Sequence, residues 1–136
     1  MRYFLAKTDP ETYAIDQLEK EKRTVWDGVN NPQAVRAIRE MKPGDKVFIY
    51  HSGGLSAIVG LAKVVSESRP DPKNPKSAVA EFEYLGRIEP PVTLAEIKQS
   101  KLFDDWALVR QGRLSTMAAP QHFVDWMKKR YPKAKI

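Results

Sequence analysis

The centre of the predicted fold is the stretch Lys46–Val65, KVFIYHSGGLSAIVGLAKVV. Two runs rich in β-branched and aromatic residues, Lys46–His51 and Ala57–Val65, flank a connection that contains two adjacent glycines. Such runs, joined in this way, indicate two neighbouring antiparallel strands, and the tip of this hairpin is expected at Ser52–Gly54. A β-sheet is therefore predicted, and the other elements are placed around the hairpin.

Four elements are predicted on the N-terminal side of the hairpin. A first strand is expected over Arg2–Lys7, and a short helix follows over Ile15–Lys22. The segment Trp26–Asn31 is expected to be a loop. A second helix is predicted over Pro32–Met41, because Asn31 suits its N-cap and proline suits its first position.

On the C-terminal side, the three prolines of Arg69–Pro75 predict a loop and exclude a helix or a central strand. Apolar and charged residues alternate over Ala78–Ile88, as in a strand with one buried face. A capping-box pattern, Thr93–Glu96, indicates the start of a short helix. A final strand over Arg113–Met117 and a closing helix over Pro120–Lys129 complete the prediction.

Strands that follow one another through turns, with short helices between them, predict an α+β domain on a curved, mainly antiparallel sheet or small barrel. The length of 136 residues fits a single domain, residues 1–136. Ten prolines against seven glycines, spread along the chain, favour many short elements over a helical bundle.

The composition also indicates where in the cell the protein is expected. The chain has no cysteine, which excludes disulfides and thiol nucleophiles and favours an intracellular protein of the cytoplasm, nucleoid or nucleus. The apolar run Tyr3–Ala6 is far shorter than the core of a signal peptide. The longest segment without a formal charge, Val47–Ala62, has 16 residues, whereas a membrane span needs roughly 20 apolar ones. We therefore expect neither export nor a membrane partner, and we expect a monomer.

The net charge of +6 is concentrated at the C-terminus. Residues 128–136 hold five basic and no acidic side chains, which leaves 18 basic and 17 acidic residues, a net charge of +1, elsewhere. This basic tail is expected either to be a solvated, frayed terminus or to contact phosphates through Lys128, Lys129 and Arg130. Charge alone leaves both interpretations open.

Motifs for catalysis or metal binding are absent from the sequence. The two histidines, His51 and His122, are 71 residues apart and belong to no metal-binding motif. Tyr50 stands where the motif of a serine hydrolase would need glycine ahead of Ser52. The chain also lacks a phosphate-binding glycine loop and a dinucleotide fingerprint. We therefore expect a binding protein with no metal and no cofactor, not an enzyme.

Polar and aromatic residues instead occur at predicted loops and strand ends, and their types suit the recognition of a flat, polar heterocycle. They are Phe4, Lys7, Trp26, Asn30, Asn31, His51, Ser52, Arg113 and Ser115. An aromatic ring can stack on a nucleobase while amide, hydroxyl or imidazole groups bind its polar edge. Structural explanations stay open: Trp26 as a core aromatic, His51 as an interior imidazole and Asn31 as a helix cap.

A series of motifs, in order and along essentially the whole chain, resembles the EVE domain family. The motifs are YFLAKTDP at residues 3–10, WDGV at 26–29, YHS at 50–52, IVG at 58–60, PVTL at 91–94 and RLS at 113–115. The resemblance implies a PUA-like fold, in which short helices decorate a strongly bent β barrel.

The resemblance also implies binding of nucleic acid that carries a modified base, with modified cytosine in DNA as the favoured ligand. The base is expected to be flipped out of its stack into a pocket. The residues then expected to contact the base are Phe4, Trp26, Asn30, His51 and Ser52. Those expected to support the pocket are Lys7, Val29, Asn31, Arg113 and Ser115.

Three departures from the family pattern qualify this interpretation. Asn30 stands where the family usually has arginine, Pro32 replaces an aromatic residue, and Phe4 replaces a tryptophan. A cationic contact is therefore missing and the aromatic surface is smaller. Three alternatives stay open: a reader of modified RNA, an enzyme that acts on a nucleoside-like small molecule, and a protein-interaction module that has lost base recognition.

Overall fold

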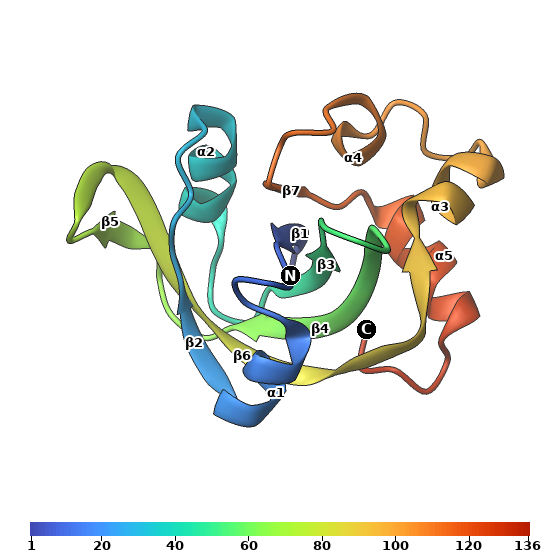
Figure 1. Cartoon of the computed structure of the whole chain (residues 1–136), viewed down its shortest axis with the longest axis horizontal. Helices are drawn as coiled ribbons and strands as arrows, with labels where there is room; N and C mark the ends of the chain where they lie inside the picture. The colour runs from blue at the N-terminus through green and yellow to red at the C-terminus, as the bar shows by residue number, and fades with distance from the viewer.

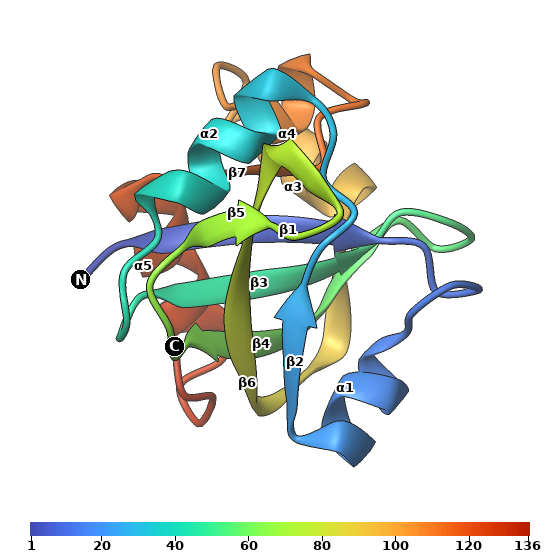
Figure 2. The same cartoon turned by 90° about the vertical axis from the view of Figure 1, so that its left-hand side faces the viewer.

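A computed structural model describes the whole chain, residues 1–136. Its centre is a seven-stranded sheet with the strand order β2-β6-β4-β3-β1-β7, and β5 pairs with β6 off this path (Figure 1). The strands are β1 (Tyr3–Thr8), β2 (Arg23–Trp26), β3 (Lys46–His51), β4 (Ala57–Val64), β5 (Arg69–Asp71), β6 (Asn74–Thr93) and β7 (Thr116–Ala118). Figure 2 shows β1, β3 and β4 running across the view while β2 and β6 run steeply over them, so the sheet is strongly curved. It ends at β2 and at β7, and is open instead of a closed barrel.

The predicted hairpin is confirmed. Strands β3 and β4 pair antiparallel, from Lys46 opposite Lys63 to His51 opposite Ala57. Strand β1, in contrast, pairs with β3 in parallel. The other strand pairs are antiparallel, so the sheet is mixed and mainly antiparallel.

Strand β6 extends well beyond the predicted Ala78–Ile88. It pairs with β5 and β2 near its start and with β4 up to its end. Two register shifts between β4 and β6 bend this pair. At Gly60 in β4, an added Cβ would lie 2.3 Å from Cδ1 of Ile15, so glycine allows the first helix to pack onto the sheet. The proline-rich segment Arg69–Pro75, predicted to be a loop, instead contributes the short strand β5, outside the main strand order, and the first two residues of β6. No helix forms in this segment, as expected.

Five helices decorate the sheet: α1 (Ile15–Glu21), α2 (Pro32–Glu40), α3 (Leu94–Ser100), α4 (Ala107–Arg110) and α5 (Gln121–Arg130). The Asn31 cap of α2 and the capping box of α3 are confirmed. Helix α4 was not predicted. The longest helix has ten residues, and none is long and apolar enough to cross a membrane.

Two boundaries differ from the prediction. Trp26, expected in a loop, is the last residue of β2, a strand that the sequence analysis missed. Strand β2 has only four residues, which gives little local signal, and its antiparallel partner β6 lies far along the chain. The expected strand Arg113–Met117 is reduced to β7, which begins only at Thr116.

The basic tail is held against the domain. Helix α5 continues to Arg130, so the first three tail residues are helical. The Arg130 guanidinium donates to Glu96 Oε2 at 2.6 Å and lies 4.6 Å from the ring centre of Trp126. The Lys46 ammonium donates to the carbonyl of Lys135 at 2.6 Å. Of the two interpretations of the tail, a frayed terminus disagrees with these contacts, which hold both ends of the tail against the domain, although its basic side chains are exposed.

Candidate functional site

A cavity of about 520 Å³ opens where the sheet does not close. Its walls are residues 7–9 and 12–13 at the end of β1 and in the following loop, residues 24–29 at the end of β2 and beyond, and Ser115 just before β7. Strands β2 and β7 are the two ends of the strand order, so the cavity lies at the seam between the sheet's ends. We call it the seam cavity.

Trp26 is part of both the core and the cavity wall. Its side chain is 7% exposed, and its ring stacks on Phe82 with the ring centres 5.0 Å apart. Tyr13 packs edge-on against the indole at 6.0 Å. The part of the indole left open borders the seam cavity. Trp26 is therefore both a core aromatic residue and part of the cavity wall.

Lys7 is the cationic group of the cavity wall. It is half-buried, and its ammonium donates to the carbonyl of Gly112 at 3.1 Å and lies 5.3 Å from the ring centre of Tyr50. Burial lowers the pKa of Lys7 below its usual value, since the charged form loses hydration. The backbone N–H of Lys7 donates to the carbonyl of Ser115 at 2.7 Å, which ties the two walls together.

Tyr13 and the loop after β1 form the opposite wall. The Thr8 hydroxyl donates to the Tyr13 carbonyl at 2.8 Å, and the Tyr13 hydroxyl donates to Glu21 at 2.7 Å. Burial, followed by the bond to Glu21, raises the pKa of Tyr13 to about 12. Tyr13 is therefore a neutral, fixed wall at physiological pH.

Two carboxylates of the cavity wall differ in their bonding. Asp9 Oδ1 accepts the backbone N–H of Glu11 at 2.9 Å and so shapes its own loop. Asp27 is exposed and accepts no hydrogen bond from the protein. Asp27 is therefore the wall group with free acceptor capacity.

Phe4, His51 and Ser52, all expected to contact the base, do not line the cavity. Phe4 is completely buried in the core, so it cannot touch a ligand. His51 Nε2 accepts the backbone N–H of Ile15 at 3.0 Å, and burial is the main cause that lowers its pKa. Ser52 is exposed, and its backbone N–H donates to the Thr8 carbonyl at 3.0 Å. His51 and Ser52 thus hold the elements around the cavity together.

The remaining predicted residues lie around the opening in different roles. Val29 is buried and lines the cavity. Asn31 Oδ1 accepts the backbone N–H groups of Gln33 at 2.8 Å and Ala34 at 3.2 Å, so it acts as the cap of α2. Asn30 and Arg113 are exposed and lie outside the lining.

Sequence reasoning missed several wall residues: Thr8, Asp9, Thr12, Tyr13, Thr24, Val25, Asp27 and Gly28. Thr8, Asp9, Asp27 and Gly28 stand inside the motifs YFLAKTDP and WDGV, so their position next to predicted residues was an available signal. Thr12, Tyr13, Thr24 and Val25 carried no such signal, because only the pairing of β2 with β6 brings their segments together.

A second cavity of about 740 Å³ lies between the loop after α3 and the start of α5. Phe103, Trp106 and His122 are among its walls, and no residue predicted for the site belongs to it. Nowhere in the chain do three or more histidine, aspartate or glutamate side chains gather in a group that could bind a metal ion.

Comparison with known proteins shows which protein family this chain belongs to. The EVE domain model matches residues 2–130. The chain belongs to the EVE domain family. Thymocyte nuclear protein 1 of Rattus norvegicus is 31% identical to this EVE domain over 124 residues, covering 71% of the chain and 55% of the relative. The chain thus spans about half the length of the curated relatives that it matches.

Solved structures share the fold of this EVE domain. A protein of Rhodopseudomonas palustris, determined by NMR, is 30% identical, with a TM-score of 0.88 over 95% of this chain and 92% of its own. Human THYN1 in complex with DNA that contains 5-methylcytosine is 25% identical, with a TM-score of 0.87 over 98% of this chain and 99% of its own. The expected PUA-like fold is confirmed, with an open sheet in place of a closed barrel.

Proposed function

We propose that this EVE domain binds DNA that contains modified cytosine and that the seam cavity receives the modified base, flipped out of the duplex. The observation that carries the proposal is the fold shared, at a TM-score of 0.87, with a human protein in complex with 5-methylcytosine-containing DNA. The seam cavity gives further support, because its volume of about 520 Å³ lies within the range of pockets for small ligands.

The apolar part of the cavity suits the ring of a base. Val25 and Trp26 at the end of β2, and Val29 just after it, lie on one wall of the cavity. A planar base packs favourably beside an aromatic side chain, and the two valines offer a surface to a methyl group on the ring. Moving an apolar substituent of the base from water to this wall therefore favours binding.

The polar part of the cavity suits the hydrogen-bonding edge of cytosine. Aspartate accepts hydrogen bonds from the exocyclic amino group of cytosine, and Asp27 has both oxygens free. Lys7 has three N–H donors, of which the Gly112 carbonyl takes one. In this proposal Asp27 accepts from the amino group while Lys7 donates to the ring carbonyl.

Binding without turnover is part of the proposal. Neither histidine lines the seam cavity. The Thr8 hydroxyl, which lies at the wall, donates to the Tyr13 carbonyl. A nucleobase that enters the cavity therefore meets hydrogen-bonding groups. It does not meet a hydroxyl paired with an imidazole that could accept its proton, which is the arrangement used for nucleophilic attack.

The direct test compares duplexes that differ at one position: cytosine, 5-methylcytosine, 5-hydroxymethylcytosine or N6-methyladenine. Titrations at one stated salt concentration should show tighter binding to a duplex with modified cytosine. Equal affinity for all duplexes would contradict the proposal. Tighter binding to an RNA of the same sequence with modified cytosine would indicate an RNA reader, and release of an altered base would indicate an enzyme.

Two matched variants test how the base is read. Asp27→Asn replaces one acceptor oxygen by a donor, and we expect it to remove about 1–3 kcal/mol of the preference for modified cytosine over thymine at the same position. Asp9→Asn keeps an oxygen for the Glu11 N–H and should leave that preference unchanged. Equal losses in both variants would exclude a specific role for Asp27.

A further inference from the structure

The arginines of this chain differ in whether their charge is already compensated. Six of the nine form ion pairs: Arg2, Arg23, Arg69, Arg87, Arg110 and Arg130. Arg39 donates to the carbonyl of Lys76 at 3.3 Å. Arg36 and Arg113 remain, exposed and with neither an ion pair nor a side-chain hydrogen bond. These two guanidinium groups are therefore free to bind an anion without breaking a bond within the protein.

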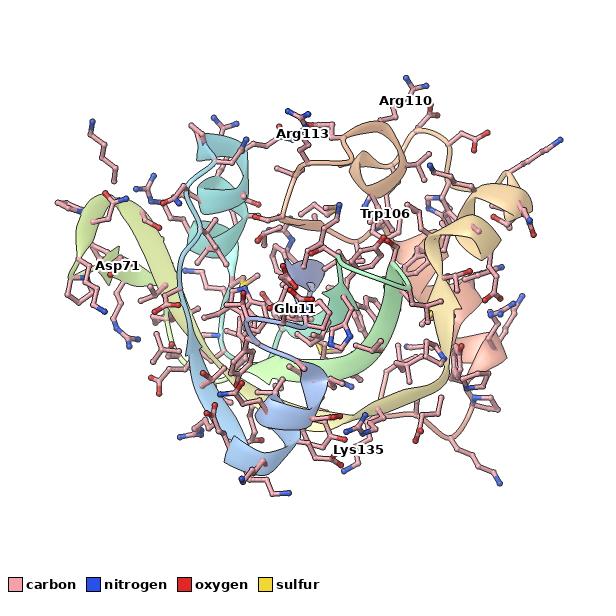
Figure 3. All side chains as sticks on the ribbon, in the orientation of Figure 1. Glu11, Asp71, Trp106, Arg110, Arg113 and Lys135 are labelled. Carbon is pink, nitrogen blue, oxygen red and sulfur yellow. The ribbon has the colours of Figure 1, made fainter.

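Both free arginines come from segments that adjoin the wall of the seam cavity in the chain. Arg113 is two residues before the wall residue Ser115, and its neighbour Gly112 holds the Lys7 ammonium. Figure 3 shows Arg113 at the upper edge of the view, in the loop that leads from α4 to β7. Arg36 lies on the exposed side of α2, the helix that follows the wall segment 24–29 and packs against β7. Arg36 thus belongs to the helix that follows β2, and Arg113 to the loop that precedes β7, the two strands at the ends of the sheet.

The basic tail lies away from this opening. Lys128 is placed 6.0 Å above the ring of Tyr3, near the start of β1, whereas Lys7 lines the cavity four residues further along the same strand. At about 3.3 Å per residue, this separates the two positions by about 13 Å. Figure 3 places Lys135 at the opposite edge of the view from Arg113. Most of the excess positive charge is therefore not at the cavity.

We propose that Arg36 and Arg113 bind DNA phosphates on the two sides of the flipped nucleotide. The proposal rests on the function proposed above, and it replaces the tail as the main phosphate contact. The planar fork of arginine matches the oxygens of a phosphate and binds them in a bidentate way.

The test is the salt dependence of binding to one duplex. Each phosphate contact contributes about −0.9 to the slope of log affinity against log salt concentration. The double variant Arg36→Ala/Arg113→Ala should therefore flatten the slope by about 1.8. Arg36→Lys/Arg113→Lys keeps both charges and should keep the slope. The matched control, Lys128→Ala/Lys129→Ala, removes the same charge from the tail and should change the slope little.

The outcomes separate this proposal from the proposed function. An unchanged slope in the double arginine variant would overturn the phosphate contacts, and so would equal flattening in the lysine control. The arginine variant should lose affinity for the unmodified and the modified duplex by the same factor, because phosphates carry no base identity. A wild-type protein that binds both duplexes equally, with a slope that depends on Arg36 and Arg113, would refute base recognition while supporting the phosphate contacts.

Discussion

The two ends of strand β1 differ in how their polar groups are bonded. At the end that begins with Tyr3, the buried carboxylate of Asp45 accepts the backbone N–H groups of Arg2 and Lys42, both at 2.9 Å. At the end that carries Lys7, the carboxylate of Asp27 accepts no bond from the protein. A fully bonded buried carboxylate holds the fold together, whereas a free one at a cavity is available to a ligand. The difference separates a structural end of the sheet from a binding end.

Trp26→Ala is the variant with the largest expected effect, because Trp26 belongs to both the binding end and the core. Its side chain is 7% exposed and stacks on Phe82. Removing a buried tryptophan costs about 3–5 kcal/mol, a large part of the stability of a domain. We expect the urea midpoint of unfolding to fall accordingly, and preference for modified cytosine to be lost in the remaining folded protein.

Val25→Ala is the control for this variant. Val25 lies on the same strand and the same cavity wall, but it is 42% exposed. We expect a loss of stability of about 0.5 kcal/mol or less. If Trp26→Ala were no more destabilising than Val25→Ala, the indole would not be packed into the core, and the binding end would be independent of the fold.

The pH dependence of stability offers a second test at the binding end. The Ile15 N–H donates to His51 Nε2 at 3.0 Å, which requires the neutral imidazole. Burial is the main cause that lowers the pKa of His51 in the folded protein; Asp16 raises it and Arg87 lowers it. In the unfolded chain His51 has the ordinary histidine pKa of about 6.5. Below that pH the unfolded chain therefore binds more protons than the folded protein. This stability contribution is complete above pH 6.5 and decreases as the pH falls below it.

His51→Gln sharpens this test, because glutamine keeps an acceptor for the Ile15 N–H but does not titrate. Urea unfolding between pH 7.5 and 5.5 should show a flatter decrease of stability in His51→Gln than in the wild type. At pH 7.5 the change should stay within about 1.5 kcal/mol, the contribution of one hydrogen bond. His122→Gln serves as the control, and an unchanged pH dependence in His51→Gln would refute the role of the neutral imidazole.

Local patterns predicted much of the fold. The β3–β4 hairpin, the Asn31 cap and the Thr93–Glu96 capping box each depend on residues close in sequence, and the structure has all three. The parallel pairing of β1 with β3, and strand β2, depend on residues far apart in the chain. No periodicity within a short window carries that information, because the partner strand determines it.

The candidate site was predicted only in part for the same reason. Lys7, Trp26, Val29 and Ser115 line the seam cavity, and the resemblance had pointed to all four. Phe4 was misplaced because β1 is buried on both faces from Tyr3 to Ala6. That burial comes from neighbouring strands and helices far along the chain, which the residues around Phe4 do not indicate. Tyr13 and Thr24 could not be predicted, since they become wall residues only when α1 and β2 fold back over the end of β1.

The smallest expected effect lies in the basic tail. Arg130 and Glu96 form an ion pair at 2.6 Å with side chains 39% and 40% exposed, so the pair should contribute only about 0.2–1 kcal/mol. A double-mutant cycle with Arg130→Ala and Glu96→Gln measures this coupling by urea unfolding, since glutamine keeps an acceptor for the capping box. Arg130→Ala should leave the salt dependence of DNA binding unchanged, because its charge is already compensated. A flatter slope in Arg130→Ala would show that the tail does reach a phosphate, and the assignment of the main phosphate contacts to Arg36 and Arg113 would then fail.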